Sequence, residues 1–272
     1  MSGVSHWIGT EPGNDFRPAD SLPLTDRGFR YGMAVFETIG VSRGRLLFLA
    51  EHLACIRHAV AQSHFPVEAA WLQRAGEHLA SILAPSDHGV ARLHVTAGDG
   101  SPTDRVTAPR VLLSFEQRAP VAAEIRARGY QLLTCPTEFF PTLAGRKTHN
   151  YWANAAALMH VRAVGADEGV VVGPHGFVLS GCMANLFLVT AGGNIITPAA
   201  QDGARAGVVR RWVLERRNVQ VTRLQRNDLS GVIGAFLTSS WLGVMPVAAI
   251  DGKNLPEMSV SSQLVSEYHC IR

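Results

Sequence analysis

The chain has 272 residues, of which 47% are hydrophobic and 17% charged, so it can bury one large core or two modest ones and shows no bias toward disorder, collagen or a coiled coil. Its 25 basic and 22 acidic side chains are spread along the sequence without a basic run, which argues against a nucleic-acid partner. No apolar stretch could span a bilayer and the first residues lack the order of a signal peptide, so we expect no membrane partner and a cytoplasmic location.

Cysteine and histidine spacing argues against a metal enzyme. The sequence contains no C-x-x-C, H-E-x-x-H or H-x-H pattern among its 4 cysteines and 11 histidines. We therefore expect neither a structural zinc site nor a disulfide framework. The expected reduced thiols are those of Cys55, Cys135, Cys182 and Cys270.

The first half of the chain mixes strand-like and helix-like segments. Residues 30–49 are rich in β-branched and aromatic side chains and are broken by Arg43-Gly44, which predicts a hairpin with a glycine turn. The apolar spacing then predicts two helices and two strands, at residues 51–62, 71–83, 89–96 and 110–115.

The second half begins after a predicted linker at residues 117–124, where Pro120 separates two strand-like runs. Apolar spacing there predicts strands near residues 131–135, 169–172 and 184–189, and helices at residues 151–163 and 208–217. These elements predict two α/β domains, a small one at residues 1–118 and a larger one at residues 119–272.

Lys147 is the strongest candidate for a reactive group. It lies in GRKTHNYWANAAAL, at the end of a polar turn and before an apolar helix, where its stem can be desolvated in a cleft. Desolvation lowers the pKa of a lysine toward the nucleophilic range, which is the condition for forming a Schiff base. The alternative is an ordinary solvated lysine.

Several motifs occur in the same order as in the fold-type IV enzymes that use pyridoxal 5'-phosphate (PLP), and the chain resembles that family. Its members include branched-chain and D-amino-acid aminotransferases and aminodeoxychorismate lyase. The matching motifs are TDRGFRYGMAVFETI, KTHNY, ADEGVVV and ANLFLV, at residues 25–39, 147–151, 166–172 and 184–189.

The resemblance implies a two-domain α/β fold of the α+β type, similar to D-amino-acid aminotransferase, with PLP as cofactor and the larger C-terminal domain carrying the PLP lysine. It implies a homodimer and a small-molecule amino substrate. By the same resemblance, Lys147 would form the Schiff base and move protons at the substrate Cα, and Tyr151 would lie near the phenolic oxygen of the cofactor.

The phosphate of the cofactor needs backbone N–H groups and hydroxyls, which a helix N-terminus supplies. Ser240 resembles a hydroxyl donor in the family's second phosphate loop. In the alternative interpretation, residues 238–240 merely end a strand, and Arg210 and Arg211 are a solvated helical face. The residues that resemble the family's Gly-Ile-Thr turn at the head of a helix are Gly207, Val208 and Val209.

The chain departs from the family where a glutamate should face the pyridine nitrogen. The motif VLSGCMANLF has Ser180 at that position. A carboxylate keeps the nitrogen protonated and favours transamination, whereas a serine hydroxyl would leave the ring neutral. Ser180 therefore favours either elimination chemistry or lost activity.

A second departure falls in EHLACIRHAV, where the family's phosphate-binding arginine is replaced by Cys55. Each charge-assisted hydrogen bond lost from an arginine–phosphate pair costs roughly 1.5 to 3 kcal/mol, so cofactor affinity should fall. Arg57 points about 200° away around a helix, whereas His58 shares the face of Cys55. Either His58 or Arg210 could compensate.

The strings FET at residues 36–38 and SSWLGVMPVAAIDG at residues 239–252 look more like aminodeoxychorismate lyase than like either aminotransferase. Residues 96–98 read T-A-G, without the arginine of the T-R-G carboxylate trap of D-amino-acid aminotransferases. Arg92 remains available for a substrate carboxylate, although an arginine on a half-exposed strand can simply be solvated.

Three hypotheses follow. The first is a PLP-dependent lyase that converts 4-amino-4-deoxychorismate to 4-aminobenzoate and pyruvate, for folate synthesis. The second is a class IV aminotransferase acting on a branched-chain, aromatic or D-amino acid. The third is a degenerate, non-catalytic homologue that uses the cleft for binding, which Cys55 and Ser180 favour.

Overall fold

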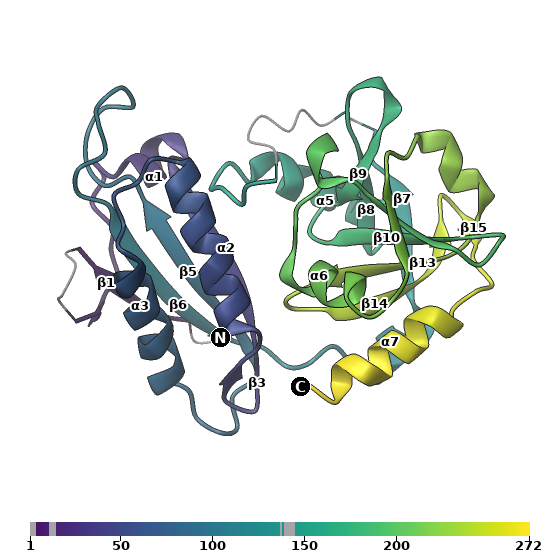
Figure 1. Cartoon of the computed structure of the whole chain (residues 1–272), viewed down its shortest axis with the longest axis horizontal. Helices are drawn as coiled ribbons and strands as arrows, with labels where there is room; N and C mark the ends of the chain where they lie inside the picture. The colour runs from purple at the N-terminus through teal and green to yellow at the C-terminus, as the bar shows by residue number, and fades with distance from the viewer. Residues whose placement is uncertain (1–3, 11–14, 137, 139–144) are drawn as a thin grey trace. The chain divides into compact units, whose positions relative to one another are not determined.

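The computed structural model describes residues 4–10, 15–136, 138 and 145–272 (Figure 1). Its contacts divide the chain into unit 1, which comprises Met1–Pro120, Arg146–Asn150 and Arg272, and unit 2, which comprises Val121–Gly145 and Tyr151–Ile271. The sequence assigns Lys147 to the C-terminal part. In the structure its segment groups with unit 1, because it pairs with a strand of that unit.

Among the described residues, unit 1 contains a six-stranded sheet in the order β2-β1-β6-β5-β3-β4, paired antiparallel throughout. The strands are β1 Val4–Gly9, β2 Arg17–Pro18, β3 Ala34–Ser42, β4 Arg45–Leu46, β5 Gly89–Thr96 and β6 Arg110–Gln117. The helices are α1 Arg27–Tyr31, α2 Leu49–Gln62 and α3 Ala69–Ser81. The strand predicted at residues 89–96 is confirmed, and both long helices begin two residues earlier than predicted.

The predicted hairpin turn is confirmed between β3 and β4. Arg43 and Gly44 both have positive φ, 51° and 69°, as a tight turn between antiparallel strands requires. The start of the predicted hairpin is different, because α1 extends to Tyr31. The side chain of Asp26 caps that helix by accepting hydrogen bonds from Gly28 N at 2.7 Å and Phe29 N at 3.4 Å.

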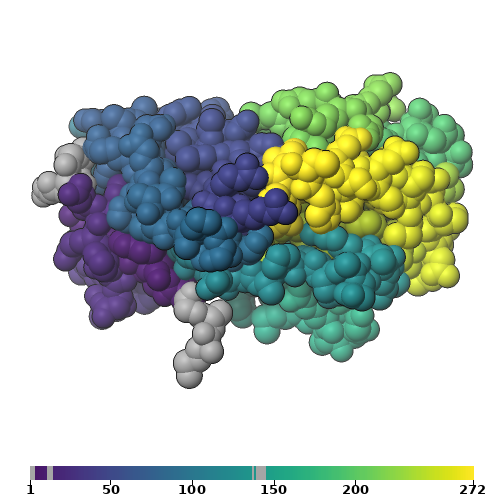
Figure 2. Space-filling view, turned by 90° about the horizontal axis from the view of Figure 1, so that it is seen from below, coloured from purple at the N-terminus to yellow at the C-terminus, as the bar shows by residue number. Residues whose placement is uncertain are grey.

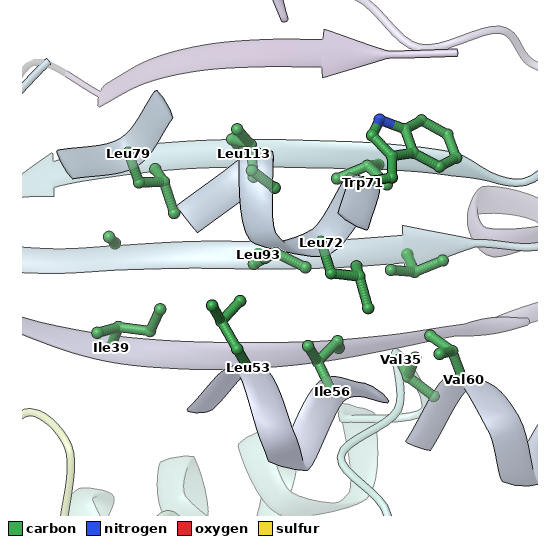
Figure 3. Packing of buried hydrophobic residues seen from close by; sticks show 14 of the residues in the cluster. Val35, Ile39, Leu53, Ile56, Val60, Trp71, Leu72, Leu79, Leu93 and Leu113 are labelled. Atoms are coloured by element: carbon green, nitrogen blue, oxygen red, sulfur yellow. The ribbon is translucent and has the colours of Figure 1, made fainter. Parts of the chain in front are cut away.

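One face of the unit 1 sheet forms the core with α2 and α3 (Figure 3). Ile39, Leu93 and Leu113 are buried in adjacent strands and meet helix residues such as Leu53 and Trp71. Since side chains alternate along a strand, residues 36, 38, 92 and 94 point to the opposite face. We call the face opposite α2 and α3 the open face of the unit 1 sheet.

Among the described residues, unit 2 contains a nine-stranded mixed sheet in the order β12-β11-β10-β13-β14-β7-β8-β9, with β15 beside β14. The strands are β7 Tyr130–Thr134, β8 Glu168–Val172, β9 Val178–Gly181, β10 Asn185–Thr190, β11 Ile195–Pro198, β12 Val219–Thr222, β13 Val232–Ser239, β14 Gly243–Ile250 and β15 Lys253–Asn254. The helices are α4 Ala123–Arg128, α5 Trp152–Ala163, α6 Val208–Leu214 and α7 Ser259–His269, with short 3-10 helices η1 Pro174–Gly176, η2 Ala200–Asp202 and η3 Arg226–Gly231.

The unit 2 core is apolar on both faces of its strands. One cluster includes Leu186, Leu237 and Met245, and a smaller one includes Val161 of α5 and Leu179. Helix α7 covers β14 and lies on the surface of this unit, in yellow in Figure 2. The helix predicted at residues 151–163 is confirmed, whereas the helix predicted at 208–217 ends three residues early.

Within the described part of the chain, every helix is too short or too polar to cross a membrane.

Candidate functional site

Lys147 lies at the edge of β3 in unit 1, in a short extended segment. Phe36 N donates a hydrogen bond to Lys147 O at 2.9 Å, His149 N donates to Ala34 O at 3.1 Å, and Thr148 pairs with Val35. Because antiparallel partners point to the same face, Lys147 shares the open face with Phe36. Its ammonium nitrogen lies 4.2 Å from the centre of the Phe36 ring, within the range of a cation–π contact.

Two histidines lie beside Phe36 on the same face. His94 of β5 is paired with Phe36 and stacks on its ring, with centroids 5.2 Å apart and an interplanar angle of 11°. His149 meets the Phe36 ring edge-on, and its Nε2 lies 2.8 Å from His94 Nδ1. Lys147, Phe36, His94 and His149 thus form one contiguous group on the open face.

The electrostatic environment of this group disfavours further positive charge. Burial lowers the pKa of His94 to about 3, and the positive fields of His149, Arg92, Lys147 and His6 act in the same direction. Burial also lowers the pKa of His149. Both imidazoles are therefore neutral at physiological pH.

Arg92 also lies on the open face, two residues before His94 in β5. Its Nη1 donates to Glu116 Oε2 at 2.9 Å, and Arg118 binds the other oxygen of that carboxylate. Arg92 is therefore ion-paired rather than simply solvated. Two cations, Arg92 and Arg118, therefore share the carboxylate of Glu116.

In unit 2, Ser180 lies in β9 opposite Val171 of β8 and is half-buried. Its hydroxyl donates to the carbonyl of Gly181 at 2.7 Å, so its oxygen lone pairs can still accept. Tyr151 occupies the N-cap position of α5. Tyr151 thus lies at the start of the helix predicted at residues 151–163.

Gly207, Val208 and Val209 form the start of α6, as predicted. The side chains of Val208 and Val209 are buried in the core, so only their backbone N–H groups can serve a ligand. The structure gives the cap position no side-chain hydrogen bond within the described residues, and the first-turn N–H groups of a helix have no intrahelical partner. Gly207 packs so closely that a Cβ there would lie 2.4 Å from Asn185 Oδ1.

Two further hydroxyl groups are candidates for binding the phosphate, one at the end of β13 and one in the turn that follows β13. Thr238, which is paired with Asn185, has its Oγ1 buried and without a hydrogen-bond partner in the described part of the chain. Ser240 is half-buried in the turn between β13 and β14. A close-packed glycine, bare N–H groups and an orphaned buried hydroxyl fit an anionic group such as a phosphate.

The two residues proposed to compensate for the lost arginine, Arg210 and His58, differ in burial. Arg210 is buried in α6, with Nη2 donating to Pro198 O at 3.1 Å and burial lowering its pKa, so it is not part of a solvated face; Arg211 is exposed. Cys55 is half-buried in α2 of unit 1, and His58 is exposed in the same helix.

Cys135 and Cys182 form a close thiol pair that sequence spacing did not reveal. Their Sγ atoms are 3.6 Å apart, above Gly169, where a Cβ would lie 2.6 Å from each. Both residues bond to the backbone of β8, since Cys135 N donates to Val170 O at 2.9 Å and Cys182 N donates to Gly169 O at 3.2 Å. Both cysteines are free thiols in the structure.

Sequence reasoning missed His94 and Asn185, and in the phosphate loop it preferred the hydroxyl of Ser240 to that of Thr238. His94 lies 55 positions from His149, and only the pairing of β3 with β5 and with the Lys147 segment brings them together. Thr238 lay within a predicted motif, but its orphaned hydroxyl is visible only in the folded chain.

The profile of the amino-transferase class IV family matches residues 34–250. An aminodeoxychorismate lyase from Vibrio harveyi is 29% identical over 244 residues, which cover 86% of this chain and 89% of that protein. The crystal structure of 4-amino-4-deoxychorismate lyase from Pseudomonas aeruginosa is 29% identical and superposes with a TM-score of 0.86, covering 97% of this chain and 98% of that one.

A hypothetical aminotransferase from Mycobacterium tuberculosis, solved in a PLP-bound form, has the same fold. It is 23% identical with a TM-score of 0.77, covering 98% of this chain and 98% of that chain. The predicted two-domain α/β fold is thereby confirmed. The chain belongs to the amino-transferase class IV family of fold-type IV, PLP-dependent lyases and aminotransferases.

Proposed function

We propose that this protein is a PLP-dependent lyase that converts 4-amino-4-deoxychorismate to 4-aminobenzoate and pyruvate. The observation that carries the proposal is the Lys147 amine held over Phe36 on the open face, in a chain 29% identical to an aminodeoxychorismate lyase along most of its length. The product would serve folate synthesis. A homodimer and a cytoplasmic location, expected from the sequence, remain predictions.

Lys147 would supply the amine that holds the cofactor by its aldehyde. PLP, when bound, supplies an electron sink for the negative charge that develops at the substrate Cα. The Lys147 amine is the proposed base that removes the Cα proton and the acid that protonates the departing three-carbon fragment. One amine can serve both steps because the first leaves it protonated for the second.

The cofactor phosphate would be held in unit 2. The backbone N–H groups of Val208 and Val209 and the hydroxyl of Ser240 are the donors carried from the sequence, and the buried Thr238 hydroxyl adds a further donor. Arg210 is a weaker candidate for replacing the arginine lost at Cys55, because its guanidinium is buried and already binds Pro198 O. Tyr151 is assigned to the cofactor's phenolic oxygen, by resemblance to the family.

Ser180 favours lyase over aminotransferase chemistry. A serine hydroxyl is uncharged, so it cannot supply the negative charge that keeps a ring nitrogen protonated, and it would bond to a neutral nitrogen by turning its O–H away from Gly181 O. A neutral ring disfavours the reprotonation that transamination needs. Arg92, which lies on the open face of the unit 1 sheet and is ion-paired with Glu116, is the proposed contact for a substrate carboxylate.

The test is product analysis with purified protein and PLP. With 4-amino-4-deoxychorismate we expect 4-aminobenzoate and pyruvate in equal amounts, and with a panel of amino acids we expect little conversion of the cofactor to its amine form. Lys147→Ala should lower turnover by at least about 10²- to 10⁴-fold, the usual contribution of proton transfer alone.

Lys253→Arg is the matched control, because the chain has only two lysines and Lys253 binds the carbonyls of Ser230 and Val232 elsewhere in unit 2. Efficient amino transfer without 4-aminobenzoate would replace the lyase by an aminotransferase. PLP binding with neither product would favour the degenerate homologue.

A further inference from the structure

The side chains around Lys147 are arranged in a row across three neighbouring chain segments. β5 occupies one edge of β3, and the Lys147 segment pairs with the other edge. The register sets Lys147, Phe36 and His94 side by side on the open face, and the contacts follow that order: ammonium on ring at 4.2 Å, then ring on imidazole at 5.2 Å. The Phe36 ring is thus the common neighbour of the amine and the imidazole.

A second contact ties the Lys147 segment to β5 directly. His149 is paired with Ala34, whose methyl group leaves room above β3 for an imidazole to cross. His149 Nε2 then reaches His94 Nδ1 at 2.8 Å, with the two rings edge-on at 5.0 Å. The hydrogen bond therefore spans β3 and fixes the Lys147 segment against a strand to which it makes no backbone pairing in the described residues.

Burial keeps both imidazoles of this hydrogen bond neutral at physiological pH. It lowers the pKa of His94 to about 3, and it lowers the pKa of His149 against the opposing influence of Asp26 and the backbone at Gly28. Two neutral imidazoles share one proton in such a bond, so one ring nitrogen donates and the other accepts. The pair therefore keeps its hydrogen bond throughout the physiological pH range.

We propose that His94 is a positioning residue for Lys147, which acts through its hydrogen bond to His149 to hold the Lys147 amine over Phe36 on the open face. The inference rests on the role of Lys147 proposed above. It assigns to His94 no proton transfer and no contact with substrate. Nothing in the resemblance on which Lys147 was chosen involves position 94.

The test measures the Lys147 amine in the protein without PLP or substrate, so it is independent of whether the proposed reaction occurs. Trace acylation followed by peptide mass spectrometry gives separate labelling rates for the two lysines, and Lys253 is the internal standard. His94→Leu should raise the labelling rate of Lys147 relative to Lys253 by about three- to fivefold, the loss of roughly one exposed cation–π contact.

Three further variants separate positioning from general loosening. His149→Leu should have the same effect as His94→Leu, and the double variant should add nothing, because both act through one hydrogen bond. His94→Asn keeps an amide near the place of Nδ1, which can donate or accept, and should give the wild-type rate within about a factor of two. His78→Leu should leave Lys147 unchanged, because His78 packs on Trp7 and Phe16 instead.

A wild-type Lys147 rate in His94→Leu or in His149→Leu, with the circular dichroism spectrum retained, would overturn the proposal. Multiplying effects in the double variant would also overturn it, since the two histidines would then act separately. If His94→Leu does not fold, His149→Leu and His94→Asn still decide the matter. An enzyme that lacks lyase activity but gives the expected labelling pattern would refute the proposed function and leave the positioning role intact.

Discussion

The two faces of the unit 1 sheet are built from alternate residues of the same strands, but one face forms the core and the other carries the candidate site. In β5, Ala91, Leu93 and Val95 are buried against α2 and α3, whereas Arg92 and His94 point to the open face. The helix-covered face holds the strands together by apolar burial. The open face carries the charged and aromatic groups around Lys147, and its geometry depends on the other face for support.

The largest expected effect comes from breaking the covered face. Leu93→Ala removes a fully buried side chain from the centre of the sheet, and such changes cost about 2–5 kcal/mol. We expect the loss in the free energy of unfolding by urea titration, with lyase turnover per folded molecule nearly unchanged. A turnover that falls as steeply as stability would mean that the two faces are not separable.

The open face should instead appear in the pH dependence of stability. His94 titrates near 6.5 when unfolded and near 3 when folded, so the unfolded state binds more protons in this window. The free energy of unfolding should therefore fall as the pH is lowered from 6.5 toward 3, by up to about 1.4 kcal/mol per pH unit from this residue.

His94→Leu removes that titration, so its stability should fall less steeply with acid than that of the wild type. The measurement is the urea midpoint of the two proteins at several pH values. Parallel curves for wild type and His94→Leu would contradict the assigned burial of His94.

The smallest effect is expected at the rim of the open face. Arg118 and then Arg92 hold the pKa of Glu116 below its ordinary value, so this carboxylate stabilises the fold above about pH 4.5 and the contribution is lost at lower pH. The pair is partly exposed, and Glu116→Gln should cost no more than about 1 kcal/mol at neutral pH. A thermal shift larger than that of Leu93→Ala would reverse the proposed ranking of the two faces.

The same contrast explains what the sequence could predict. Local patterns identified β5, the Arg43-Gly44 turn and α5, because alternation, turn chemistry and helical spacing act over neighbouring residues. They missed α7 and the strand β1, and they extended α6 three residues too far. Tertiary packing decides where such short or weakly patterned segments begin and end.

For the candidate site, motif order identified Lys147 and the start of α6, but it could not supply the pairings that join distant segments. Lys147 groups with unit 1 because its segment pairs with β3, more than a hundred positions earlier in the sequence. For the same reason, no local sequence pattern indicated that His94 lies near Lys147. The burial of Arg210, which contradicts a solvated face, likewise depends on packing against β11.

The most direct test of the account is to locate the amine that binds the cofactor. The protein is mixed with PLP, reduced with borohydride and digested, and the modified peptides are mapped by mass spectrometry. We predict one stable adduct at Lys147, absent from Lys147→Ala and unchanged in Lys253→Arg. An adduct at Lys253 alone, or none at either lysine, would contradict the assignment of Lys147 as the cofactor-binding residue.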